Sequence, residues 1–375
     1  MTERNVTYPD GARRRHGFGI IGAGVISSIH ARAIGSLPDA RIAAVTDVEP
    51  ERATLFAAAH GCAAEPDLDA LLARDDVDVV SVCVPSGLHA EVGIRAAAAG
   101  KHLVVEKPID VSLEAADRLI AAAHEAGVAM TVISQHRFDQ GLIELRRLLD
   151  KDALGRLVLG EAGTKWYRSQ AYYDSAAWRG TWALDGGSLM NQGIHYADLL
   201  LWTMGPVAEV TALFSTETHQ IEVEDTALAV LRFTSGAVGT IVASTAVFPG
   251  FAQRLEISGT AGTIVIEDGE IIRCDLTADG AQTSMRGRRN TRGSAPSATA
   301  AKPADLEIAS HAAQIGDLLD AIDEGRAPSV TGADGRAILE LVRAVYESAR
   351  DGRTVRLPAV LQVVESQLAD RKSVV

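Results

Sequence analysis

The sequence contains few cysteines and no long apolar segment. Its three cysteines, Cys62, Cys83 and Cys274, lack the close spacing of metal-binding pairs and are too few for a disulfide framework. No apolar run reaches the roughly 18 residues that a membrane-spanning helix requires. These absences predict a protein of a reducing, cytoplasmic compartment, with no membrane span and no metal site.

Positive charge is also scarce. Lysine and arginine number 36 against 49 aspartate and glutamate residues, which gives a formal net charge of −13. So acidic a chain disfavours nucleic acid and anionic membranes as partners. The length of 375 residues exceeds what one hydrophobic core usually holds, so we expect two domains.

A glycine-rich turn follows the first apolar run, which begins at His16. Ser27 stands where a dinucleotide-binding fingerprint prefers glycine or alanine. Gly22 lets the chain turn sharply out of a strand, and Gly24 leaves room for a diphosphate beside the amides of the next helix. We therefore predict that a dinucleotide binds at Gly22, Ala23, Gly24, Val25 and Ile26.

The next expected strand, residues 41–47, ends in Asp47. A carboxylate there can accept hydrogen bonds from both adenosine ribose hydroxyls and repels a 2′-phosphate, so the sequence favours NAD over NADP. Two alternatives stay open at this point. Asp47 can cap a helix before Pro50, and S-adenosylmethionine-dependent enzymes also pair a glycine turn with a later acid.

Short strands and helices alternate through about residue 137, which predicts a doubly wound parallel sheet. Polar groups follow several of these strands, at the carboxyl edge where ligands bind such sheets. Two adjacent charges at the end of a buried strand, Glu106 and Lys107, are costly unless something uses them. The loop after residues 77–84 should border the cofactor through Val84, Pro85, Ser86 and His89.

The second half has strand-like segments separated by turn signals such as Ser235-Gly236, which is typical of an antiparallel sheet. Residues 280–302 are rich in Ser, Thr, Ala, Gly and Arg and predict a mobile loop or insertion. We expect strands at 157–163, 207–216, 226–233, 238–246, 254–258, 263–267, 271–276 and 354–357, and helices at 306–323 and 335–349.

The expected domains are a dinucleotide-binding domain at 16–137 and a substrate-binding and oligomerisation domain at 138–358, followed by a tail at 359–375. Three arginines ahead of an apolar stretch, Arg13 to Arg15, resemble a twin-arginine export signal. Cleavage after that stretch would remove the glycine turn. We therefore interpret residues 1–15 as a disordered extension.

Aromatic residues gather in one block of a chain that is only 5% aromatic. Aromatic platforms with arginine and amide donors suit the apolar C–H faces and hydroxyl groups of a sugar. We expect substrate contacts from Tyr167, Arg168, Asn191 and Gln192. The alternative is that the aromatic block, which includes Trp166, Trp178 and Trp182, forms the core of a domain interface.

A polar stripe is expected on one helix, residues 189–204. Asn191, His195 and Asp198 would share one face and look toward the cofactor. A neutral imidazole suits the removal of a hydroxyl proton near pH 7, so we predict that His195 is a general base. Lys107 would contact the same hydroxyl and stabilise a developing alkoxide.

The ordered motifs Gly22-Ala23-Gly24, Val84-Pro85-Ser86 with His89, Glu106-Lys107-Pro108, and Asp185-Gly186-Gly187 through His195 and Asp198 resemble the glucose-fructose oxidoreductase and inositol dehydrogenase family, Gfo/Idh/MocA. The resemblance extends from His16 to about Leu357. It implies an N-terminal Rossmann domain and a C-terminal domain with a large, open, mainly antiparallel sheet. That sheet commonly forms homodimers or homotetramers.

The resemblance also implies site roles. Lys107 and His195 would be the catalytic pair, Trp178 and Arg179 would line the nicotinamide, and Gln135 would contact its ribose. The family often carries an acid four residues before the histidine, where this chain has Asn191; a neutral amide there would orient substrate. The Asn191-Gln192 pair and the aromatic block look like the UDP-N-acetyl-aminoglucuronate 3-dehydrogenase group.

That likeness makes oxidation at a sugar C3 the leading expectation, with NAD as cofactor and a sugar, sugar acid or nucleotide sugar as substrate. An inositol or aldose dehydrogenase, or a sugar reductase, is the alternative within the family. A dinucleotide-binding sensor without chemistry is the alternative outside enzymes. The presence of both Lys107 and His195 argues against the sensor.

Overall fold

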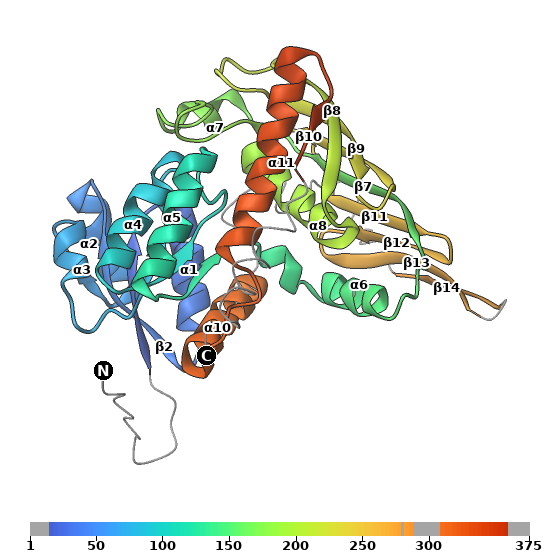
Figure 1. Ribbon diagram of the computed structural model, residues 1–375. Coiled ribbons are helices and arrows are strands. Elements are labelled where there is room, and N and C mark those ends of the chain that lie inside the picture. The colour runs from blue at the N-terminus through green and yellow to red at the C-terminus, as the bar shows by residue number, and fades with distance from the viewer. Residues whose placement is uncertain (1–14, 279–280, 288–307, 359–375) are drawn as a thin grey trace, which may run out of the picture.

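Two sheets organise the chain, one parallel and one mainly antiparallel (Figure 1). The computed structural model describes residues 15–278, 281–287 and 308–358. The expected extension, most of the 280–302 loop and the tail therefore lie outside the described residues. No helix within the described ranges has the length and apolar character needed to cross a membrane.

The first sheet has six parallel strands in the order β3-β2-β1-β4-β5-β6, and it confirms the Rossmann prediction. The order reverses between β1 and β4, which is where ligands bind such sheets. Helix α5 shows how local sequence sets the boundaries: the side chain of Ser112 caps its first turn, and Gly127 ends it in the left-handed conformation at φ 66°. The strands are β1 His16–Ile21, β2 Ala40–Thr46, β3 Ala63–Ala64, β4 Val79–Val82, β5 His102–Val105 and β6 Met130–Val132.

Helices and short 3-10 turns connect these strands. Both faces of the sheet are covered, and every residue of β1 is buried. The connecting elements are α1 Val25–Gly35, α2 Pro50–His60, α3 Leu68–Leu72, η1 Ser86–Leu88, α4 His89–Ala98, α5 Leu113–Ala126 and η2 Gln135–Phe138.

The second sheet has nine strands in the order β14-β13-β12-β11-β7-β10-β9-β8-β15. Its pairs are antiparallel except β7 with β10, so the expected architecture is confirmed. Burial alternates along β9, with one face toward the core. The strands are β7 Leu157–Lys165, β8 Val207–Ser215, β9 Thr226–Phe233, β10 Val238–Ser244, β11 Arg254–Gly259, β12 Gly262–Glu267, β13 Glu270–Ala278, β14 Ala281–Arg286 and β15 Val355–Arg356.

The long helix α11, Gly332–Asp351, lies between the two sheets (Figure 1). It packs against β8 of the second sheet and against α5 of the first unit, while α10, Ala309–Glu324, packs against α1 and η2. Helices α10 and α11 thus return to the Rossmann unit and pack against it. The remaining helices are α6 Gln140–Asp150, α7 Gln170–Asp174 and α8 Ile194–Met204.

Two expectations need correction. Residues 281–286 were expected to be a loop, but they form β14, which pairs with β13 at the edge of the sheet. Polar side chains along this segment hid the strand from the hydrophobic pattern. The expected helix at 189–204 is split, because Leu189–Gly193 forms a π turn, η3, before α8 begins.

Candidate functional site

The glycine turn has the geometry that a diphosphate requires. Gly22 adopts a positive φ of 92°, and a Cβ atom there would lie 2.6 Å from the Cys83 carbonyl oxygen. Among the described residues, a Cβ atom on Gly24 would meet nothing within 4 Å, so open space lies before the first turn of α1. The turn therefore fits a dinucleotide, with Ala23, Val25 and Ile26 contributing the adjacent backbone.

Asp47 lies against this turn. Its carboxylate accepts hydrogen bonds from the Ala23 amide at 2.7 Å and the Glu49 amide at 2.8 Å. The N-cap of α2 is Glu49, not Asp47. The acid therefore stands beside the turn, where the charge argument for NAD places it, instead of capping α2.

Two of the expected cofactor residues are engaged inside the sheet instead. The ring of His89 is buried, with Nδ1 2.7 Å from the Pro108 carbonyl and Nε2 2.9 Å from the Val84 carbonyl, so it has no free nitrogen for a cofactor. It ties the end of β4 to the chain after β5. The Glu106 carboxylate is also buried, and it binds His30. Of the same group, Val84 and Pro85 remain partly exposed at the edge, and Ser86 is buried.

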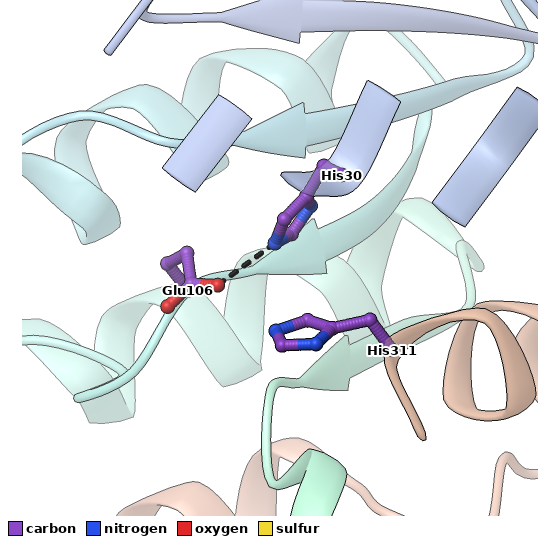
Figure 2. A group of neighbouring side chains, drawn as sticks. All are labelled: His30, Glu106 and His311. Carbon is purple, nitrogen blue, oxygen red and sulfur yellow. Dashed lines mark hydrogen bonds and ion pairs between the residues drawn. The ribbon is translucent and has the colours of Figure 1, made fainter. Parts of the chain in front are cut away.

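Glu106 belongs to a cluster of ligand-type side chains with His30 of α1 and His311 of α10 (Figure 2). One ligand atom from each lies within 4.8 Å of the others, and all three side chains are buried. The Nε2 atom of His30 is 2.8 Å from Glu106 Oε1, and its Nδ1 atom is 2.6 Å from the Ser81 hydroxyl. No local pattern in the sequence indicates this cluster, because its members come from three distant segments.

The charges in this cluster are strongly coupled. Burial opposes a charge on His30, but Cys83 and Glu106 raise its pKa to about 10. Burial likewise opposes the carboxylate, but His30 and the neighbouring cations lower the pKa of Glu106 to about 2. Burial and the charge of His30 lower the pKa of His311 to about 3. The donor set would suit a metal such as zinc, but the 2.8 Å distance between His30 Nε2 and Glu106 Oε1 is that of a direct hydrogen bond between the two side chains. We interpret the cluster as a buried ion pair beside a neutral histidine.

Lys107 projects from the same strand end toward the second half of the chain. Its Nζ atom donates to the Asn191 backbone oxygen at 2.8 Å and to Asn191 Oδ1 at 3.1 Å. Burial lowers the pKa of Lys107, as do Arg179 and Arg168, while the charges of Glu106 and Asp185 oppose that shift. The two halves of the chain therefore meet at this ammonium group.

His195 lies at the start of α8, close to Lys107. It lines a small cavity together with Lys107, Ile133 and Ile194. Its ring makes an edge contact with His136 at a centroid distance of 5.2 Å. Burial, with the charges of Lys107 and His136, lowers the pKa of His195 well below its ordinary value. The imidazole is neutral at physiological pH and can accept a proton.

Asp198 lines the same small cavity as Lys107 and His195, and its carboxylate is engaged there in an ion pair. Its carboxylate forms a buried, bidentate ion pair with Arg137, at 2.6 and 2.9 Å. Arg137 also binds Asp334 of α11 at 2.9 Å. The π turn alters the phase of the helix between Asn191 and Asp198, so a regular periodicity cannot place both on one face. Arg137, in η2, therefore joins α8 to α11 through these two acids.

Tyr172 occupies the centre of the aromatic block, although it was not among the expected site residues. Its hydroxyl oxygen accepts hydrogen bonds from Arg179 at 2.7 Å and from Gln192 at 3.5 Å. The guanidinium groups of Arg179 and Arg168 lie 4.3 and 5.4 Å from its ring centroid. Tyr172 thus brings together three of the expected residues. In the sequence, the signal is the Tyr172-Tyr173 pair between Arg168 and Trp178.

The other aromatic residues divide between site and core. Trp178 stacks with Arg179 at 4.5 Å and stays beside the cationic group. Trp182 packs edge-on against Tyr346 of α11 at a centroid distance of 5.1 Å, a contact within the second half of the chain, and it is 39% exposed. Tyr167 contacts Phe248 at 5.2 Å in a loop after β10.

Two buried amide oxygens have no partner in the part of the chain that the structure describes. The Oε1 atoms of Gln135 and Gln192 each lack a hydrogen bond there. A buried acceptor without a partner is costly, so both positions are suited to a hydroxyl or amide donor from a ligand. This agrees with the expected contact of Gln135 with a nicotinamide ribose and of Gln192 with a substrate.

Asp185 is a further residue that was not predicted as part of the site. Its side chain is buried, accepts a hydrogen bond from the Gly180 amide at 2.7 Å and accepts another from Asn191 Nδ2. Burial raises the pKa of Asp185, while Arg179 and Lys107 oppose that shift. It precedes the glycine pair of the quoted motif, but nothing local in the sequence links it to Lys107.

Comparisons with known proteins agree with this geometry. Residues 16–134 match a family model described as an oxidoreductase family with an NAD-binding Rossmann fold. Residues 142–265 match the model of the GFO/IDH/MocA C-terminal domain. Together the two matches cover the first sheet and the strands β7 to β11 of the second.

Individual relatives span almost the whole chain. The crystal structure of the WlbA dehydrogenase from Bordetella pertussis, in complex with NADH and UDP-GlcNAcA, is 32% identical and has a TM-score of 0.80, over 92% of this chain and 99% of that one. Inositol 2-dehydrogenase of Rhizobium meliloti is 28% identical over 91% of this chain and 98% of its own length. Levoglucosan dehydrogenase of Pseudarthrobacter phenanthrenivorans is 26% identical over 91% and 98%.

Proposed function

Because the chain belongs to the Gfo/Idh/MocA oxidoreductase family, we propose that it oxidises a secondary alcohol of a sugar acid or nucleotide sugar with NAD. The proposed reaction takes place between a dinucleotide-binding domain at 16–137 and a substrate domain at 138–358. One observation carries the proposal: Lys107 and His195 come from different domains and line the same cavity.

His195 is the proposed base. A neutral imidazole can take the hydroxyl proton of the substrate, and the lowered pKa of His195 keeps the imidazole neutral. Lys107 holds a positive charge near the same cavity and stabilises the alkoxide that forms as the proton leaves. Asn191 fixes the Lys107 ammonium through two hydrogen bonds.

NAD is the cofactor, and it accepts the hydride from the carbinol carbon when bound. The glycine turn, Asp47 and Gln135 are proposed to hold its diphosphate and its two riboses. Replacing Asp47 by Ala removes the charge that repels a 2′-phosphate, so we expect NAD affinity to fall and NADP affinity to rise. Fluorescence titration of both dinucleotides measures the ratio; tighter NADP binding by the unchanged protein would contradict the role of Asp47.

The charge around Lys107 supports an anionic substrate. Arg168 and Arg179 lie close enough to Lys107 to lower its pKa, and Asp185 is the carboxylate that faces this group from the substrate domain. Three cations converging on one site favour a carboxylate or a diphosphate. This supports a nucleotide sugar or sugar acid over a neutral inositol or aldose.

A substrate panel with NAD tests the proposal. We expect NADH formation, followed by absorbance, with UDP-GlcNAcA and related sugar acids, and slower formation with myo-inositol and levoglucosan. Faster turnover of the neutral sugars would support the inositol or aldose alternative. NAD binding without turnover of any member would support the sensor.

We also propose that the second sheet joins two copies of the chain. Its outer face exposes apolar side chains on adjacent strands: Leu213 of β8 lies opposite Leu228 of β9, and they are 73% and 47% exposed. Val230, two residues along β9, is 60% exposed. A contiguous apolar patch on a flat sheet suits burial against an identical surface.

Light scattering tests the oligomer. The double variant Leu228→Glu with Val230→Glu should yield monomers, because both introduced carboxylates would be buried in the interface between the two copies. Leu55→Glu, on the exposed part of α2, is the matched control and should leave the assembly unchanged. An unchanged mass for the double variant would refute the interface.

All three cysteines are free thiols. No disulfide stabilises the described fold, which supports the proposal of a reducing, cytoplasmic compartment.

A further inference from the structure

A short polar chain joins the cation of the proposed active site to a buried acid. Lys107 Nζ donates to Asn191 Oδ1 at 3.1 Å, and Asn191 Nδ2 donates to Asp185. These two bonds fix the orientation of the amide, with its oxygen toward the ammonium and its nitrogen toward the carboxylate. The three residues come from the end of β5, the π turn and the loop before it.

The position of Asp185 is costly without this chain. The residue is 1% exposed, and its other hydrogen bond comes from the Gly180 amide. A buried carboxylate is stable only where hydrogen bonds and opposite charges compensate for lost hydration. Lys107 and Arg179 supply those charges.

Resting on the proposed function, we propose that Asp185 is a positioning residue that acts on Lys107 through the Asn191 amide. The carboxylate polarises and holds the amide, and the amide oxygen holds the ammonium in place. Asn191 itself cannot carry charge. Members of the family often carry an acid at the position of Asn191. In this chain the negative charge is supplied by Asp185, which binds the other side of the Asn191 amide.

This arrangement assigns charge stabilisation to Lys107 and proton acceptance to His195. A carboxylate touching Lys107 could accept its proton, whereas an amide cannot. Lys107 therefore remains a proton-bearing cation through the reaction, and the hydroxyl proton of the substrate goes to His195. The charged groups that face Lys107 are Glu106, Asp185, Arg168 and Arg179, with neutral His195 beside them.

The test uses two variants of nearly unchanged shape. Asp185→Asn keeps an acceptor for the Gly180 amide, but it removes the charge and places an NH2 group against Asn191 Nδ2, so the hydrogen bond from Asn191 is lost. The double variant D185N/N191D returns the charge to position 191, where the amide introduced at position 185 can still donate to it. The second change also restores that hydrogen bond, so the deciding readout is the position of the pH limb, which a purely structural Asp185 would not move.

The first measurement is the pH dependence of kcat/KM. Loss of the Asp185 charge makes Lys107 release its proton more readily, so in Asp185→Asn the alkaline limb should move to lower pH by roughly half to one unit. The double variant should move the limb back. An unshifted limb in Asp185→Asn, or no recovery in the double variant, would overturn the proposal.

The second measurement does not depend on activity. Acetic anhydride labels neutral amines, and mass spectrometry of the peptide that contains Lys107 gives its labelling rate in the full-length protein. In Asp185→Asn at fixed pH the rate should rise roughly threefold to tenfold, while the rate of Lys101 stays constant as an internal reference. An unchanged labelling rate of Lys107 would refute the influence of Asp185 on Lys107 through Asn191. A raised labelling rate in a protein that oxidises no sugar would support that influence and reject the proposed function.

Discussion

His30 and His195 are both linked to the Glu106-Lys107 pair, but they meet opposite halves of it. His30 contacts the carboxylate, and its pKa rises to about 10. His195 lies near the ammonium group, and burial together with that charge lowers its pKa well below the ordinary value. The first imidazole is therefore favoured as a cation and the second as a neutral base.

The difference shows that a histidine's role follows from its neighbours and not from its position in a motif. Both rings are in helices, and both adjoin the same strand end. Burial alone would make both neutral. The adjacent acid makes His30 a structural partner, and its absence leaves His195 available for proton transfer.

Among the substitutions that test the contrast between His30 and His195, His195→Ala should have the largest effect. Loss of a general base typically costs about 10² to 10⁴ in rate, so we expect turnover to fall by that factor while NAD affinity stays near normal. Lys107→Ala should have a loss of similar order, because the alkoxide is then unstabilised. Steady-state kinetics and NAD titration measure both quantities.

His124→Ala, on the exposed part of α5, is the control and should retain activity. Near-normal turnover in both His195→Ala and Lys107→Ala would remove the proposed mechanism.

The second prediction concerns the structural histidine. Glu106→Gln leaves the buried His30 without its counter-charge, and breaking a buried pair in this way costs about 3 kcal/mol of unfolding free energy. The stabilisation is present below the ordinary His pKa of 6.5 and fades as pH rises through about 10. On the acid side it is present above 4.5 and fades as pH falls through about 2.

Thermal or urea unfolding at pH 7 and at pH 10 measures this effect. The deficit of Glu106→Gln should be large at pH 7 and smaller at pH 10. Glu91→Gln, an exposed change of the same charge on α4, should differ little from the original protein. Equal stability of Glu106→Gln at pH 7 would mean that no ion pair exists there.

Residues were predictable from the sequence where the site depends on contiguous chain. The glycine turn and Lys107 follow their strands directly, so both were predicted from the rule that ligands bind at the carboxyl ends of parallel strands. Asp185 and His311 could not be found this way, because their partners lie elsewhere in the chain and only the folded packing brings them together. The break in the helix between Asn191 and His195 could not be predicted either, because hydrophobic periodicity does not record a π turn.

A third, smaller effect is expected in the pH profile. Because His195 must be neutral to accept a proton, the acid limb of kcat/KM should lie below the ordinary histidine value of 6.5. His30 should contribute no inflection between pH 5 and 8, since it stays charged across that range. A limb at or above 6.5 would assign the base to a different group.

The smallest expected effect comes from removing metal. If His30 and Glu106 share a proton, a metal ion has no place between them, and dialysis against EDTA should leave turnover and melting temperature unchanged. Elemental analysis should then find less than one metal ion per chain. Stoichiometric zinc, with activity lost on chelation and restored by zinc, would make His30, Glu106 and His311 ligands. His30 would then be held by a metal instead of a proton, and its contrast with His195 would need a different cause.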